Sequence, residues 1–158
     1  MKIVLPFILL LLFYSEQKSQ LVTISNLPNG HKIHIRYSSQ GCFHFSTYEF
    51  DFVGGPTIKL SIVKVDRKWN KKQNSYYDFR RVQLDSLILS NQDVYRLDCL
   101  ISYYRSRPEG ICTTNDSIDI IYYADGKQVS SESYTDASCS TNRMKEILTF
   151  NELIERIK

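Results

Sequence analysis

The chain of 158 residues carries a formal net charge of +3, and 13% of its residues are aromatic. This length is typical of one domain, and the near balance of charge gives no support to a nucleic-acid or membrane partner. The aromatic content, mostly tyrosine, favours a domain rich in strands. The sequence has no P-loop, dinucleotide-binding, G-x-S-x-G or H-E-x-x-H motif. We therefore expect no cofactor and favour a protein that is not an enzyme.

Residues 1–19 are predicted to form a signal peptide. A short positive start is followed by the apolar run 3–13, which is shorter than the roughly 20 residues that span a bilayer. Small serine residues follow this run, and we expect cleavage between Ser19 and Gln20. The protein is then secreted or periplasmic, with 20–158 as a single domain and no membrane association after cleavage. An uncleaved anchor is the alternative.

Alternating apolar and polar residues predict strands in the first half of the chain. Ile33, Ile35 and Tyr37 alternate with charged side chains, which is the pattern of a strand with one buried face. A Gly-Gly-Pro sequence at 54–56 separates two further strands. The segment 66–75 is polar and lacks periodicity, so we predict a loop there. The strands expected in this half are 20–26, 31–37, 42–53, 57–65 and 76–84.

Two helices and a hairpin are predicted in the second half. Ser90 is suited to cap a helix over about 91–106, in which apolar residues recur at helical spacing. A hairpin with Asp125-Gly126 at its turn is expected between residues 112 and 139. A second amphipathic helix is expected at about 143–157. These elements predict an α+β fold in which an antiparallel sheet of about five to seven strands, a meander plus the hairpin, carries two helices.

Four cysteines in an exported chain predict a domain stapled by two disulfides. Opposed residues of an unbroken two-residue hairpin have numbers with a constant sum, and Cys112 and Cys139 share the sum of Asp125 and Gly126. We therefore predict a Cys112–Cys139 bridge and, by elimination, a Cys42–Cys99 bridge. The alternative pairs Cys99 with Cys112 and Cys42 with Cys139.

The stretch whose side chains best suit the binding of a partner is a basic segment that contains the only tryptophan of the chain. A cationic loop with an aromatic ring can hold an acidic protein or a glycan surface, so the leading hypothesis is a non-catalytic binding module. The alternative is a solvated loop whose tryptophan folds back on the sheet. The candidate binding residues are Arg67, Lys68, Trp69, Lys71 and Lys72.

Two of the three histidines are the basis for the competing catalytic and metal-binding hypotheses. His34 or His44 could serve as the base of a small secreted hydrolase, because such sites are defined by geometry and not by order along the chain. The same two histidines could bind a metal with Glu49 or Asp51, although no ligand-spacing motif supports this, and we predict no metal. A purely structural envelope protein is the third class.

Overall fold

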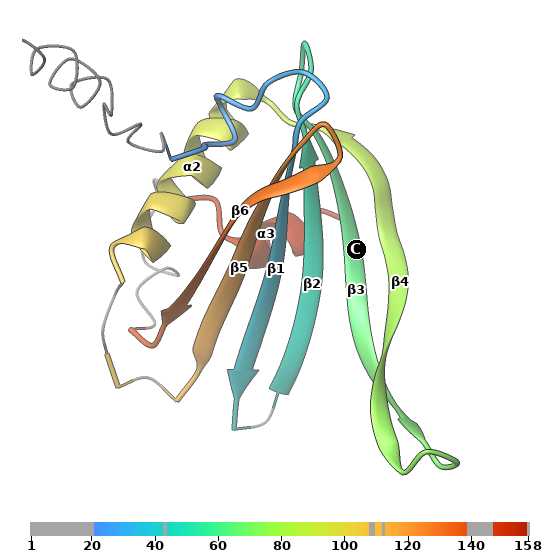
Figure 1. Cartoon of the computed structure of the whole chain (residues 1–158). Coiled ribbons are helices and arrows are strands. Elements are labelled where there is room, and N and C mark those ends of the chain that lie inside the picture. The colour runs from blue at the N-terminus through green and yellow to red at the C-terminus, as the bar shows by residue number, and fades with distance from the viewer. Residues whose placement is uncertain (1–20, 43, 108–109, 112, 139–146, 158) are drawn as a thin grey trace, which may run out of the picture.

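The computed structural model describes residues 21–42, 44–107, 110–111, 113–138 and 147–157, apart from the side chains of residues 44 and 82–85. Six antiparallel strands form one sheet in the order β4-β3-β2-β1-β5-β6 (Figure 1). The strands are β1 (Lys32–Gly41), β2 (His44–Val53), β3 (Lys59–Asn70), β4 (Ser75–Ile88), β5 (Asn115–Ala124) and β6 (Lys127–Asp136). The helices are α2 (Asn91–Arg105) and α3 (Phe150–Glu155).

The helix α2 begins where the sequence predicts it. The Ser90 hydroxyl accepts a hydrogen bond from the Asp93 backbone N–H at 3.1 Å, which satisfies one of the donors left free at a helix start. Val94 and Leu97 lie on the buried face of the helix. Because the helix connects β4 at one edge to β5 near the other, it crosses the face of the sheet and covers the core.

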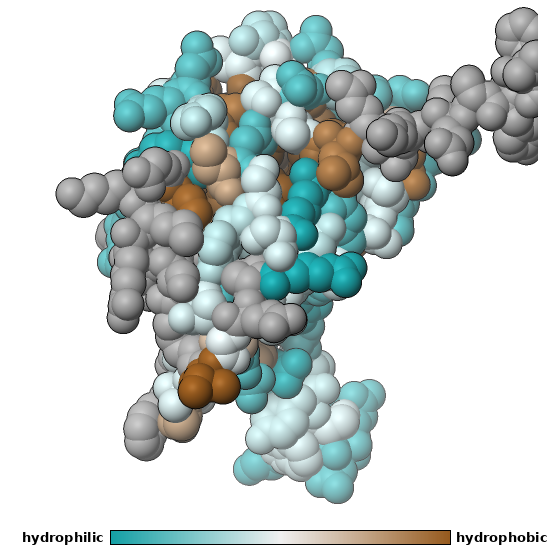
Figure 2. Space-filling model, turned by 90° about the vertical axis from the view of Figure 1, so that its left-hand side faces the viewer, coloured by the Kyte–Doolittle hydropathy of each residue, from teal (hydrophilic) through white to brown (hydrophobic). Residues whose placement is uncertain are grey.

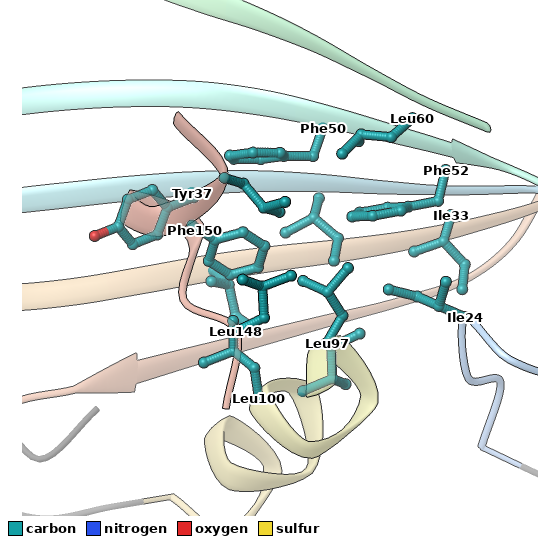
Figure 3. Packing of buried hydrophobic residues seen from close by; sticks show 14 of the residues in the cluster. Ile24, Ile33, Tyr37, Phe50, Phe52, Leu60, Leu97, Leu100, Leu148 and Phe150 are labelled. Atoms are coloured by element: carbon teal, nitrogen blue, oxygen red, sulfur yellow. The ribbon is translucent and has the colours of Figure 1, made fainter. Parts of the chain in front are cut away.

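The core lies between one face of the sheet and a layer made by α2, α3 and the segment that precedes β1. Alternate residues of β1 and β2, such as Ile35 and Phe50, point into it and are fully buried. Figure 3 shows Phe150 of α3 between Tyr37 and Phe50, with Leu97 of α2 on the side away from the sheet. The ring centroid of Phe150 is 5.1 Å from that of Tyr37 and 4.9 Å from that of Phe50.

The predicted α+β fold is wrong in its proportions. The molecule is mostly sheet, and the helix expected at 143–157 covers only Phe150–Glu155 among the described residues. Thr149 starts α3 with a capping box in which its hydroxyl and the Glu152 carboxylate bond each other's backbone N–H. Residues 143–146 lie outside the described residues. The strand expected at 20–26 is also absent from the described residues 21–26, which pack on α2 instead: Asp98 accepts a hydrogen bond from the Ile24 N–H at 2.7 Å.

The predicted disulfides are also wrong for the two cysteines that the structure describes. Cys42 and Cys99 are unpaired. Cys42 lies in the turn between β1 and β2, whereas Cys99 lies on α2. Because both thiols are free, the structure contradicts the predicted Cys42–Cys99 bridge. Cys112 and Cys139 lie outside the described residues.

The turn of the β5–β6 hairpin is the predicted one. Asp125 and Gly126 both have positive φ, 51° and 73°, as a two-residue hairpin turn of type I′ requires. However, the register shifts between Tyr122 and Tyr123. This bulge adds one residue to the β6 side, so the constant-sum argument that placed Cys112 opposite Cys139 fails beyond it.

The strands β3 and β4 extend beyond the rest of the sheet. β2 pairs with β3 only as far as Val65, whereas β3 and β4 remain paired from Asp66 opposite Phe79 to Asn70 opposite Ser75. Residues 66–79 therefore form a two-stranded antiparallel ribbon, which projects past the ends of β1 and β2 in Figure 1. The prediction of a loop over 66–75 is wrong, because only residues 71–74 form the turn.

Candidate functional site

The ribbon of residues 66–79 exposes four aromatic side chains. Trp69 and Tyr76 are cross-strand partners on one face, with ring centroids 4.8 Å apart in an edge-to-face arrangement. Tyr77 and Phe79 lie on the other face, because neighbouring strand residues point to opposite sides. The exposed fractions are 46% for Trp69, 68% for Tyr76, 45% for Tyr77 and 37% for Phe79. Trp69 therefore does not fold back onto the sheet.

Cations accompany these rings on both faces. Lys68 Nζ lies 3.6 Å from the centroid of the Phe79 ring. The Arg67 guanidinium lies 4.8 Å from the centroid of the Phe45 ring at the start of β2, so the aromatic surface continues onto the main sheet. Each cation–π contact at an exposed site contributes about 0.5–1 kcal/mol.

The carboxylates of the ribbon are already neutralised by neighbours. Asp66 lies 3.2 Å from Lys64 Nζ and 3.8 Å from the Arg81 guanidinium. Asp78 lies 3.0 Å from the Arg36 guanidinium of β1 and 3.8 Å from that of Arg67. Both acidic groups therefore lie near the base of the ribbon and leave its far end cationic.

The positive charge of the chain is concentrated here. Residues 64–81 contain seven Lys and Arg side chains and two Asp side chains, an excess larger than the net +3 of the whole chain. Within the described part of the chain, no carboxylate lies within ion-pair distance of Lys71 or Lys72. The turn therefore presents two ammonium groups that are free to meet an external anion.

The turn itself is held in one shape by Asn70. Its side-chain oxygen accepts hydrogen bonds from the backbone N–H groups of Lys72 at 3.0 Å and Gln73 at 3.3 Å, and its amide nitrogen donates to the Gln73 side chain at 3.0 Å. Asn74 takes a left-handed conformation with φ of 49°, which asparagine tolerates better than most residues. The lysines are thus displayed on a preformed turn.

A shallow depression of about 500 Å³ lies at this end of the ribbon. In Figure 2 the same end of the molecule is a lobe below the main body, coloured white and teal. The depression combines aromatic surface with ammonium and amide groups, which can contact both an apolar face and an anionic substituent of one ligand. It is lined by Trp69, Asn70, Lys71, Lys72, Gln73 and Tyr77.

Ion pairs tie the base of the ribbon to the sheet. Arg80 donates two hydrogen bonds to the carboxylate of Glu49 on β2, at 3.0 and 3.1 Å. These bonds raise the pKa of the Arg80 guanidinium and satisfy Glu49, which is buried. Together with the Arg36–Asp78 pair, they link β1 and β2 to β4 across the intervening strands.

The five candidate residues all lie on the ribbon but not on one surface. Arg67 and Trp69 share a face, Lys68 lies on the opposite face, and Lys71 and Lys72 lie in the turn. Sequence reasoning missed the aromatic residues of β4 that complete both faces. The Tyr76–Tyr77 doublet was the available signal, since adjacent tyrosines on a strand place one ring on each side.

His34 is part of an ionic cluster on the open face of the sheet. Its Nδ1 lies 2.7 Å from Asp51 Oδ1, and Lys32 Nζ lies 3.4 Å from the same oxygen. Burial opposes ionisation of Asp51, but the His34 hydrogen bond and the Lys32 charge outweigh it and hold the pKa of Asp51 below its usual value. Among the described residues, no hydroxyl or thiol bonds the His34 ring. The side chain of His44 lies outside the described residues.

Comparisons of the chain with protein-family models, with curated proteins and with solved structures find no match. Among the described residues, no group of three His, Cys, Asp or Glu side chains could hold a metal ion. Over the same residues, every helix is too short or too polar to cross a membrane.

Proposed function

We propose that this protein is an exported, non-catalytic binding module that holds an acidic protein or glycan surface through the ribbon of residues 66–79. The observation that carries this proposal is the pairing of exposed rings with unneutralised lysines on an element outside the core. Four of the fourteen ribbon residues have exposed aromatic side chains, and none of these four belongs to the main core. Aromatic and basic side chains of this kind dominate the energetics of many interfaces.

The geometry of the ribbon also supports a binding role. The Asn70 turn and the Trp69–Tyr76 ring pair hold it in one conformation, so less conformational entropy is lost when a partner binds. The hydrolase alternative has less support, because the Asp51 carboxylate beside His34 is shared with Lys32 and the described residues place no nucleophile beside it.

Site-specific photo-crosslinking tests the location of the contact. A photoreactive phenylalanine analogue replaces Tyr76 on the ribbon or, as a control, Val129 on β6, which is similarly exposed at 61%. Both variants are expressed in the organism or culture that produces the protein. We expect covalent adducts from position 76 and not from position 129. Equal yields at both positions, or adducts from position 129 alone, would contradict the proposal.

A further inference from the structure

We infer that the partner of the ribbon is an anionic polysaccharide, whose sugar rings pack on Trp69, Tyr76 and Tyr77 and whose carboxylate or sulfate groups meet Lys68, Lys71 and Lys72. This inference rests on the proposed function and specifies the partner class for the same surface. Three features of the ribbon lead to it: its narrow shape, the side chains on its two faces and the polarity of its tip.

The free part of the ribbon is narrow. It contains five residue pairs, from Asp66 and Phe79 to Asn70 and Ser75. At about 3.4 Å per residue and about 5 Å between strands, one face is roughly 17 Å long and 10 Å wide. A stable protein interface buries about 800 Å² on each partner, which is several times this face. A thin polymer chain, in contrast, can contact both faces and the turn as it passes.

The side chains match the chemistry of a charged sugar. A pyranose ring has apolar C–H faces that pack on aromatic rings, and Trp and Tyr supply such surfaces together with a polar edge. Lysine offers a charged donor for a carboxylate or sulfate oxygen. In the depression at the tip, Trp69 and Tyr77 lie beside Lys71 and Lys72. One ligand with an apolar ring face and an acidic substituent can therefore satisfy both types of group.

The polarity of the tip disfavours an anionic membrane. Residues 66–79 contain no aliphatic side chain, and the leading residues of the turn are Lys71, Lys72, Gln73 and Asn74. Insertion of this tip would bring two ammonium groups toward the hydrocarbon before any aromatic ring, which is unfavourable. Single-stranded nucleic acid also binds aromatic and basic side chains; the predicted export signal argues against it, and the experiment below includes it.

Titration calorimetry of the full exported chain with defined polymers tests the inference. The probes are heparin as a sulfated polysaccharide, polygalacturonate as a carboxylated one, dextran as a neutral one, poly-L-glutamate, oligothymidylate and vesicles of phosphatidylglycerol. We expect binding to heparin or polygalacturonate, no binding to dextran, and at least tenfold weaker binding to the other three probes. Tighter binding of oligothymidylate or the vesicles overturns the inference.

Two kinds of variant separate ring packing from charge. Lys71→Gln/Lys72→Gln should weaken polysaccharide binding about tenfold at low salt, and the deficit should shrink in 0.5 M salt as charges are screened. Tyr77→Leu, which keeps the side-chain bulk, should weaken binding by a similar factor at both salt concentrations. The matched control Lys59→Gln/Lys127→Gln removes the same charge from exposed positions outside the ribbon and should change affinity less than twofold.

The outcomes distinguish this inference from the function on which it rests. If poly-L-glutamate binds best and the ribbon variants abolish that binding, the ribbon is the binding element and the polysaccharide inference is overturned. If ribbon and control variants lose polysaccharide binding equally, the association reflects net charge alone, and both proposals are overturned. Because the lysine variants lie in an exposed turn, unchanged thermal unfolding checks that they are folded.

Discussion

Phe150 is the side chain through which the C-terminal segment joins the sheet. It is 2% exposed, and it packs between Tyr37 of β1 and Phe50 of β2. Aromatic pairs at these separations add to the free energy of simple burial. The same neighbourhood raises the pKa of Tyr37 far above its usual range, mainly because burial disfavours the phenolate. A short helix of six residues is therefore held by packing and by its capping box.

Replacing Phe150 should destabilise the protein strongly. We expect Phe150→Ala to lower the free energy of unfolding by about 3–5 kcal/mol, the usual cost of removing a buried phenylalanine. Phe45→Ala is the matched control, because Phe45 is 47% exposed and should cost less than about 1 kcal/mol. Urea unfolding followed by fluorescence measures both values, and similar losses for the two variants would contradict this account of the core.

Gly54 permits a close approach of two backbone segments. A Cβ atom at this position would lie 2.0 Å from the Pro28 carbonyl oxygen and 2.6 Å from that of Leu27. The contact is fixed by hydrogen bonds from Gly30 N–H to the Gly54 oxygen at 3.0 Å and from Gly54 N–H to the His31 oxygen at 2.9 Å. The turn before β1 therefore packs directly on the chain that leaves β2.

A methyl group at position 54 should force these segments apart. Gly54→Ala should lower stability by about 2–4 kcal/mol, through strain and loss of the two hydrogen bonds. The neighbouring Gly55→Ala should cost less, since its Cβ would approach only the Thr57 oxygen, at 3.2 Å. Thermal unfolding of the two variants measures the loss of stability that each substitution causes. A larger effect at Gly55 would show that the turn is not packed as described.

At the scale of elements, one ion pair joins the end of α2 to the edge strand β6. Arg105 donates two hydrogen bonds to the Glu132 carboxylate, at 2.9 and 2.8 Å, and the Tyr134 hydroxyl donates a third at 2.7 Å. Burial opposes ionisation of Glu132, but these bonds and the Arg105 charge outweigh it and lower the pKa of the carboxyl. The pair is mostly shielded from solvent.

The contribution of this pair should depend on pH in a defined direction. A carboxyl whose folded pKa is lowered stabilises the protein above its unfolded pKa, near 4.3, and this stabilisation is lost as pH falls through the folded value. We expect Glu132→Gln to lower the free energy of unfolding by about 1–3 kcal/mol at pH 7, and by progressively less below about pH 4.3. Urea unfolding between pH 3 and 7 measures this. Asp125→Asn in the exposed β5–β6 turn serves as control, and a constant difference for Glu132→Gln would contradict the prediction.

The ribbon is an element with its own local stability. Beyond Val65 its strands pair only with each other, and isolated two-stranded hairpins are marginal in water. The Trp69–Tyr76 pair and the Asn70 turn therefore carry much of its order. Its opening need not expose the core, because no ribbon residue belongs to the core cluster.

Removing the tryptophan ring should loosen the ribbon and little else. In Trp69→Ala we expect amide hydrogen exchange of the paired residues in 66–79 to become about fivefold faster or more. The reason is that a cross-strand aromatic pair stabilises the closed ribbon by about 1 kcal/mol. Exchange of β1 amides should stay within a factor of two. Uniform acceleration over both regions would instead mean that the ribbon and the sheet open together.

For the whole molecule, the distribution of charge and apolar surface separates two regions. The sheet and its helices contain the core, whereas the ribbon combines four exposed aromatic rings with lysines that have no ion-pair partner among the described residues. Under the proposed function, the body is a support and the ribbon is the contact surface.

The proposed export is tested separately, by N-terminal sequencing of the protein recovered from the secreted or periplasmic fraction. The expected first residue is Gln20, and an intact Met1 there would contradict cleavage.

Local patterns determined several elements correctly from the sequence. The alternation of Ile33, Ile35 and Tyr37 identified the buried face of β1, Ser90 marked the start of α2, and Asp125-Gly126 marked a hairpin turn. Each of these features depends on the few residues around it, since strand periodicity, helix capping and turn conformation are short-range effects.

The tertiary structure alone decided the extent of β3 and β4 and the state of Cys42 and Cys99. The ribbon strands bury no face, so residues 66–70 lack the apolar alternation that identifies a strand, and their pairing depends on residues 75–79 across the turn. The prediction for Cys42 and Cys99 failed because compartment and count favour bridges, whereas a bridge also needs a fold that brings two cysteines together, and these two are free. The basic segment with its tryptophan was evident in the sequence; its display on a two-stranded ribbon with aromatic residues on both faces arises from the pairing of residues 66–70 with residues 75–79.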